Sequence, residues 1–359
     1  MEKFTTPEGD VHLVRPASSR DIVVEQPTAA QVQLLEALDG RTPLAELERR
    51  FGEREVGETI AQFQELEVIE DAADDELVPA PERERFDRQL RCFSDSPGAE
   101  LTPSECQARL REAKVAVLGV GGLGGSSALA LASCGVGELW LVDGDRVELS
   151  NLNRQTLYTV DDVGQLKVEA AKRALRSFYP EMRVTATARR LGGEAEVADF
   201  VAGADVVVDS ADWPAFEFER WCNAACFAAG IPFITMSHFS WVARVGPLFV
   251  PGRTGCYSCQ EIAYRREYPL LDTATTTPVG SSEAATLGPA CGLIGNHVAM
   301  EVMHLLTGLA EPATLGASLN YDLRTMEMRR EEIVPEPDCP VCSELEHEER
   351  LGLEAAASR

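Results

Sequence analysis

Hydrophobic residues recur with two different periods along this chain. The N-terminal part holds β-branched runs at 11–15 and 21–25, followed by segments with apolar residues at helical spacing. Thr28 is well placed to cap the first helix, and Gly40 to end it. The other elements expected here are a helix opened by Thr42-Pro43, a helix around Ile60 and a short strand at 68–69. This order predicts a small winged-helix α+β unit.

From Lys114 onward, runs typical of buried strands alternate with helical segments. Strands are expected at 115–118, 139–142, 184–187, 206–208 and 233–236, with helices at 165–178 and 215–229. Such alternation is typical of a Rossmann-like α/β fold, a doubly wound and mostly parallel sheet covered on both faces.

Proline and acidic residues separate the two patterns. The stretch 71–104 is acidic and then interrupted by prolines, with one ordered insert expected at 82–92. The expected domains are a winged-helix unit at 1–75, a linker at 76–104, an α/β domain at 105–345 and a disordered acidic tail at 346–359.

Charge excludes several classes of partner. The 359 residues include 33 Lys and Arg against 59 Asp and Glu, a formal charge of −26. This charge repels nucleic acid and anionic membrane surfaces. No run approaches the roughly 18 apolar residues of a membrane span, and the N-terminus lacks a signal-like apolar segment. We therefore expect a cytoplasmic protein with reduced cysteines.

A glycine-rich turn at 119–124 lies between the first strand and the first helix of the α/β domain. Glycines let backbone N–H groups approach a phosphate, and a helix N-terminus favours negative charge. Asp143, at the end of the next strand, is placed to bind ribose hydroxyls. These residues predict a nucleotide site rather than a turn without a ligand, but alone they do not separate NAD from ATP.

The residues that follow favour ATP. The run Ser150–Gln155 contains Arg154, Lys167 comes thirteen residues later, and Asp212 follows a further strand. A triphosphate with Mg²⁺ needs fixed cations and a carboxylate, whereas a dinucleotide needs few cations. The pair Arg154 and Lys167 therefore argues against an NAD-dependent oxidoreductase.

The sequence of motifs GVGGLG, LVDGD, SNLNRQ, a lysine and DSAD resembles the ThiF/MoeB/HesA adenylating enzymes, relatives of ubiquitin-activating enzymes, over about residues 82–342. The resemblance implies that Asp143 binds ribose, Asn151, Arg154 and Lys167 bind the phosphates, and Asp212 holds Mg²⁺. The nucleotide-binding set expected is Gly119, Gly121, Gly122, Asp143, Asp145, Asn151 and Gln155. The implied reaction is attack of a carboxylate oxygen on the α-phosphorus of ATP, with Arg154, Lys167 and Asp212 as catalytic residues.

The segment 85–90 resembles a family element whose second arginine reaches the partner subunit's ATP site. This resemblance implies a homodimer in which Arg88 acts in trans. The alternative is a charged surface helix, since ordinary Arg/Glu patterning also produces this composition.

Two C-x-x-C pairs, Cys256/Cys259 and Cys339/Cys342, offer four thiolates suited to a structural Zn²⁺. The family resemblance implies the same pairing. Cys134, Cys222, Cys226 and Cys291 are expected to be small buried residues.

Two features of the resembled family are missing. The crossover segment 260–290 contains no cysteine, so we expect no thioester intermediate. It holds instead a loop at 272–278 that could close over a peptide. Trp213 stands where the family usually has Asn, which changes the wall expected beside Mg²⁺.

The N-terminal unit resembles PqqD-like domains, which bind leader peptides of ribosomally made, modified peptides. Residues 1–75 hold 18 acidic and 7 basic residues, which disfavours a DNA-reading winged helix. A purely structural dimerisation unit is the alternative.

The combination resembles microcin C-type peptide adenylating enzymes and predicts adenylation of a carboxylate on a precursor peptide. Two further functions stay open at this point. The chain could activate a ubiquitin-like sulfur carrier, or it could recruit leader peptide for a separate cyclodehydratase without catalysis.

Overall fold

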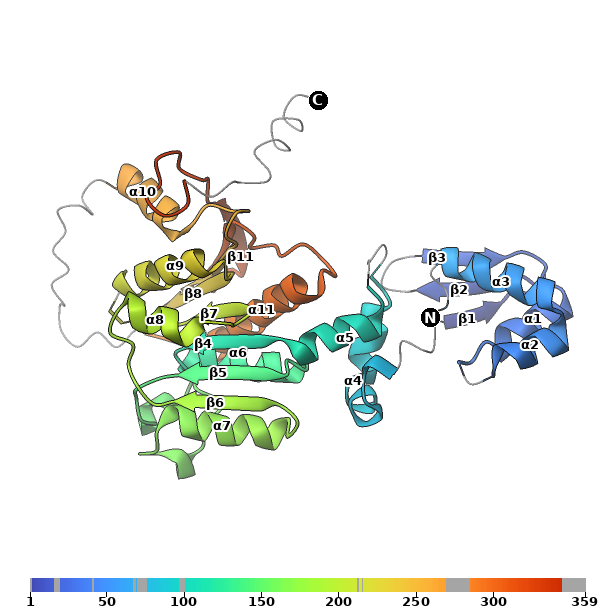
Figure 1. Cartoon of the computed structure of the whole chain (residues 1–359), viewed down its shortest axis with the longest axis horizontal. Coiled ribbons are helices and arrows are strands. Elements are labelled where there is room, and N and C mark those ends of the chain that lie inside the picture. The colour runs from blue at the N-terminus through green and yellow to red at the C-terminus, as the bar shows by residue number, and fades with distance from the viewer. Residues whose placement is uncertain are drawn as a thin grey trace. The chain divides into compact units, whose positions relative to one another are not determined.

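The computed structural model of the chain describes residues 2–15, 20–40, 42–66, 69, 76–96, 101–211, 213–214, 216–268 and 285–343. It divides into two compact units, residues 1–108 and 109–359, which are described separately (Figure 1). No helix in these described ranges is both long and apolar enough to cross a bilayer. The expected strand at 68–69, the loop at 272–278 and the tail at 346–359 fall on residues that are wholly or partly outside the described ranges.

The first unit begins with an antiparallel sheet in the order β1-β2-β3. Its elements are β1 (Glu2–Thr5), β2 (Val11–Arg15), β3 (Arg20–Val24), α1 (Ala29–Ala37), α2 (Leu44–Phe51) and α3 (Glu53–Glu65). Leu34, Leu47 and Val56 form a shared core between the three helices. Thr28 caps α1 with a full capping box, as predicted, whereas α2 is preceded by Pro43 without a side-chain cap. β1 was not predicted.

Two more helices follow in the proline-interrupted segment. α4 (Ala80–Phe93) matches the expected insert, but α5 (Pro103–Glu112) begins inside the stretch expected to be linker, which ends at 104. Pro103 is the first residue of α5, a position where its missing N–H is tolerated. Thr102 and Glu105 exchange capping hydrogen bonds of 2.8 and 3.3 Å. Pro103 therefore begins a helix and does not mark the end of a linker.

The second unit is built on an eight-stranded sheet in the order β11-β10-β9-β8-β7-β4-β5-β6. The strands are β4 (Lys114–Leu118), β5 (Glu138–Val142), β6 (Arg183–Thr187), β7 (Val206–Asp209), β8 (Phe233–Phe239), β9 (Val242–Phe249), β10 (Ala317–Asp322) and β11 (Glu327–Glu332). The neighbouring strands β6, β5, β4, β7 and β8 run parallel to one another, whereas β8, β9, β10 and β11 pair antiparallel. The predicted fold class is confirmed for the parallel half, while β9, β10 and β11 were not predicted.

Helices cover both faces of this sheet (Figure 1). The helices are α6 (Gly122–Ser133), α7 (Lys167–Phe178), α8 (Glu194–Val201), α9 (Glu217–Ala229), α10 (Tyr257–Glu267) and α11 (Gly288–Thr307). α6 and α11 pack so closely that a Cβ on Gly295 would lie 2.5 Å from Ser126 Cβ. α8 and α9 share a core with Val207 and Phe233 on the opposite face. The segment 260–290, which was expected to be a loop, is helical at both ends, in α10 and α11. The carboxyl ends of the parallel strands meet at one edge of the sheet.

Candidate functional site

The glycine turn connects β4 to α6 and leaves the start of α6 without a side-chain cap. Gly119 has φ +84°, a conformation that favours glycine, and its N–H donates to Val142 O at 2.9 Å. A Cβ on Gly124 would overlap Gly119 O, so a side chain there would push α6 away from β4. The first amides of α6 therefore lie open at a positive helix end.

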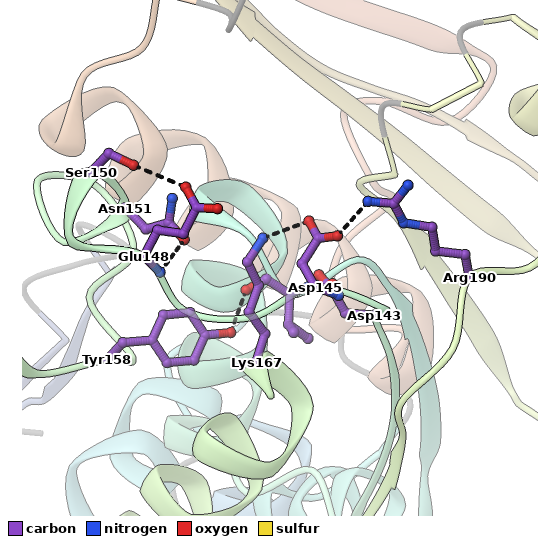
Figure 2. A network of polar contacts seen from close by, with 9 residues as sticks. Asp143, Asp145, Glu148, Ser150, Asn151, Tyr158, Lys167 and Arg190 are labelled. Carbon is purple, nitrogen blue, oxygen red and sulfur yellow. Dashed lines mark hydrogen bonds and ion pairs between the residues drawn. The ribbon is translucent and has the colours of Figure 1, made fainter. Parts of the chain in front are cut away.

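Asp143 fixes this turn from the end of β5. Its Oδ2 accepts from Val120 N at 3.0 Å, and its Oδ1 accepts from Asp145 N at 2.8 Å. The Tyr158 hydroxyl donates to Val120 O at 2.7 Å from a buried position, and this burial raises the pKa of Tyr158 (Figure 2). Each Asp143 oxygen keeps a second acceptor site, so binding of ribose stays a prediction beside this structural role. Tyr158 was not predicted as a site residue.

Two cations converge on Asp145 (Figure 2). Lys167 Nζ lies 3.0 Å from Asp145 Oδ2, and an Arg190 guanidinium nitrogen lies 2.8 Å from Oδ1. Lys167 begins α7 and its side chain is 9% exposed, against 74% for Arg190. Burial raises the pKa of Asp145, but hydrogen bonds from Arg190 and Lys167 outweigh burial and hold it below its usual value. Arg190 was missed because it lies in a loop with no motif.

The segment after β5 folds into a short 3₁₀ helix, Leu149–Asn151, which positions the next polar side chains. The buried Asn151 accepts from Glu148 N at 3.1 Å (Figure 2). Arg154 donates to Ser150 O at 3.0 Å. Arg154 Cγ also lies 3.4 Å from the position a Gly122 Cβ would take, so this arginine lies against the glycine turn.

Gln155 is the clearest sign that the turn binds a ligand. It is 4% exposed, and its Oε1 has no hydrogen-bond partner among the described residues. Its Nε2 lies 3.8 Å from the position of a Cβ on Gly121. An open helix N-terminus, a glycine cradle, two nearby cations and an unpartnered amide together fit a phosphate-bearing nucleotide.

The described structure does not test the roles of two predicted catalytic residues. Asp212 lies outside the described residues. Arg88 lies on α4 in the first unit, with a side chain 89% exposed and its Nε 3.8 Å from Asp87. Trp213, beside Asp212 in sequence, is 67% exposed. Their predicted roles therefore stay predictions.

The four paired cysteines gather at a separate buried centre. Their Sγ atoms all lie within 4.8 Å of one another, with Cys256–Cys339 and Cys259–Cys342 at 3.4 Å and Cys256–Cys259 at 4.0 Å. Zn–S bonds of about 2.3 Å in a tetrahedron place sulfurs about 3.8 Å apart. The N–H of Glu336 donates to Cys259 Sγ at 3.3 Å, as in thiolate metal sites. All ten cysteines are free thiols, so this donor set fits a closed Zn²⁺ site.

The remaining cysteines are mostly buried, as predicted. Cys222, Cys226 and Cys291 are buried, whereas Cys134 is only half-buried at the end of α6. Cys291 Sγ lies 2.8 Å from the position of a Gly122 Cβ, so the start of α11 also packs on the glycine turn.

Comparison with known proteins agrees with this geometry. A model of the ThiF family matches residues 86–341. The sulfur carrier protein ThiS adenylyltransferase of Escherichia coli K12 is 36% identical over 236 residues, 66% of this chain and 88% of the relative. The molybdopterin-synthase adenylyltransferase of the same organism is 35% identical over 238 residues, 66% of this chain and 90% of the relative.

Solved structures extend the likeness to both units. The crystal structure of PaaA has a TM-score of 0.74 and 26% identity, covering 92% of this chain and 98% of PaaA. The crystal structure of E. coli MccB with ATP has a TM-score of 0.68 and 25% identity, covering 95% and 97%. The chain therefore belongs to the ThiF family and is an adenylyltransferase of the ThiF/MoeB type.

Proposed function

We propose that this enzyme uses ATP and Mg²⁺ to adenylate a carboxylate of a ribosomally synthesised precursor peptide whose leader the N-terminal unit binds. The main support is the extent of the likeness. MccB, crystallised with ATP, is similar over 95% of this chain, whereas the ThiS adenylyltransferase covers 66%. MccB has also been crystallised with MccA.

The first unit offers a groove for an extended peptide. β3 is at the edge of its sheet and pairs only with β2 among the described residues. Beside it lies a groove of about 380 Å³ between β3, α1 and α3, lined mainly by apolar side chains. Val23, Val32, Leu35, Phe63 and Leu66 are among them. An added strand would satisfy the free edge and place alternate side chains in this groove. The acidic surroundings favour a leader with basic residues.

In the second unit, the open start of α6 and Arg154 would hold the phosphates of ATP. A substrate carboxylate oxygen bonds to the α-phosphorus while the bond to the β-phosphate bridging oxygen breaks, and pyrophosphate leaves. Lys167, held by Asp145, would offset the charge that develops on the phosphates. Asp212 would hold Mg²⁺, which supplies further positive charge on these oxygens. No side-chain nucleophile takes part in this step.

The finer predictions belong to the same proposal. The four-cysteine centre holds a structural Zn²⁺, and two copies of the chain form a homodimer in which Arg88 completes the partner's site. A cytoplasmic location also stays a prediction.

ATP–pyrophosphate exchange tests the proposal. Purified enzyme is given a synthetic precursor peptide from a reading frame beside its gene, or a small ubiquitin-like protein ending in Gly-Gly. Exchange that depends on the peptide supports the proposal. Exchange that depends only on the sulfur carrier contradicts it, and no exchange with either favours a non-catalytic recruiter.

A further inference from the structure

Four buried polar atoms below the first turn of α9 lack hydrogen-bond partners among the described residues. They are Asp209 Oδ2, Glu219 Oε2, Thr235 Oγ1 and Arg244 Nε. Asp209 and Thr235 are each 3% exposed. Because unpaired buried polar atoms are rare and destabilising, a group of four calls for a partner.

The sheet register places these atoms on one face. Asp209, the last residue of β7, is the register partner of Thr235 on β8. Arg244 on β9 pairs with Ser237, which follows Thr235 by two positions and so shares its face. Glu219 comes from the first turn of α9, which covers this face.

The charged groups of Asp209, Glu219 and Arg244 lie close enough to one another to shift the pKa of both carboxyl groups. Burial and the nearby Glu219 raise the pKa of Asp209, while Arg244 opposes this change. Burial likewise raises the pKa of Glu219, again against Arg244. The group therefore combines two crowded carboxyl groups with the Arg244 guanidinium, and Arg220 also acts on Glu219.

The position links the group to the nucleotide site. Ser210, the residue after Asp209, donates its hydroxyl to Gly119 O and Leu118 O, both at 2.9 Å. Asp209 thus lies at the carboxyl edge of the parallel strands, where ligands of such sheets bind.

The unpaired donors and acceptors restrict the chemistry of the ligand that can bind. A ligand carboxylate offers no N–H donor to the oxygens of Asp209 and Glu219, and an ammonium offers no acceptor to the Arg244 N–H. An amide group supplies N–H donors to the carboxyl oxygens and a carbonyl oxygen to Arg244 and Thr235. We propose that Asp209, Glu219, Thr235 and Arg244 form an amide-binding pocket for the acyl end of the substrate. The assignment of this amide to a peptide rests on the proposed function.

The amide of the substrate is either a side-chain carboxamide or a peptide bond. Either one would fix the residue next to the activated carboxylate. The four residues then determine specificity and position the substrate, and they exchange no atoms with it.

Saturation-transfer NMR on the full-length enzyme tests the pocket with small probes. Acetamide represents a carboxamide, N-methylacetamide represents a peptide bond, and N,N-dimethylacetamide has no N–H. We expect transfer to the first or second probe, whichever source applies, and none to the third. Equal transfer to all three, or transfer to none, overturns the proposal.

Thr235→Val, which removes the unpaired hydroxyl at nearly constant volume, provides the second measurement, with the exposed Ser237→Ala as its matched control. We expect Thr235→Val to reduce amide transfer several-fold without lowering Tm, and Ser237→Ala to change neither. A lower Tm for Thr235→Val contradicts the pocket, because the hydroxyl would then serve the fold.

Exchange kinetics separate this inference from the proposed function. With a peptide that supports exchange, Thr235→Val should raise the peptide KM about tenfold or more and leave the ATP KM unchanged. An unchanged peptide KM counts against the pocket. Absence of exchange in the wild type counts against the proposed function, while the probe measurement still decides the pocket.

Discussion

Replacing Lys167 by Met should separate its catalytic role from its structural one. The change removes a buried ammonium that lies 3.0 Å from Asp145 Oδ2 and keeps an unbranched side chain that is shorter by one atom. Arg190→Met is a matched control, since Arg190 contacts the other oxygen of the same carboxylate at 2.8 Å but is 74% exposed.

The structure sets the expected magnitudes. A hydrogen bond to a charged group contributes about 1.5–3 kcal/mol, and the 41% exposure of Asp145 favours the lower end, about 1.5 kcal/mol, for Lys167→Met. Arg190→Met should lower the free energy of unfolding by less than about 1 kcal/mol, as for exposed ion pairs. Removing a fixed positive charge from the transition state should reduce the adenylation rate about 10²–10³-fold in Lys167→Met.

The pH dependence has a defined sign. The pKa of Asp145 is lowered in the folded state, so its ion pairs stabilise the fold above its unfolded-state pKa of about 3.9. This contribution is lost as the pH falls through the folded-state pKa. The stability difference between wild type and Lys167→Met should therefore shrink only in that acid range.

Urea unfolding and pyrophosphate exchange measure the two effects. A Lys167→Met enzyme within about threefold of wild-type exchange would refute the catalytic role. An Arg190→Met enzyme that loses as much activity as Lys167→Met would show that activity depends on the Asp145 carboxylate rather than on the Lys167 ammonium.

Three further predictions follow from other parts of the molecule. Metal analysis of enzyme purified without chelator should find one zinc per chain, and no zinc with Cys256, Cys259, Cys339 and Cys342 freely titratable would contradict the metal site. Mixing inactive Arg88→Ala and Lys167→Ala subunits should restore roughly a quarter of wild-type activity through hybrid dimers with one intact site, whereas no rescue or a monomeric enzyme would contradict the arginine in trans. Gly124→Ala should lower the unfolding free energy by about 1–3 kcal/mol because its Cβ overlaps Gly119 O, while Gly121→Ala should leave Tm nearly unchanged because its Cβ would meet only Gln155 Nε2, at an ordinary contact distance of 3.8 Å.

The sequence predicted elements whose side chains follow a strong period. Buried parallel strands such as 115–118 are continuous apolar runs, and Thr28 carried a local capping signal that the structure confirms. β11 was not predictable in this way, because all of its residues are exposed and charged or polar residues dominate it. α5 was missed because one proline outweighed the Thr102 and Glu105 capping pair.

In the candidate site, too, residues in regular motifs were predicted and contacts between distant segments were not. Motif residues such as Lys167 were found because their spacing is regular, but contacts between distant segments were not. Tyr158 reaches Val120 across 38 positions, and Arg190 reaches Asp145 across 45. The amide pocket draws on β7, β8, β9 and α9, and only the sheet register brings those residues together.

Leader recognition by the first unit is the central claim, and a blocked groove tests it in the full-length enzyme. Val32→Arg places a charge in the groove beside β3, and Gln33→Arg, exposed on the same helix and not part of the groove lining, is its control. Pyrophosphate exchange is measured with the full precursor and with a leaderless core peptide. We predict that Val32→Arg raises the KM for the full precursor tens- to thousands-fold, the range expected from effective concentration. The KM for the core peptide should stay unchanged. Equal loss on both peptides, or no change with either, would contradict leader binding in this groove.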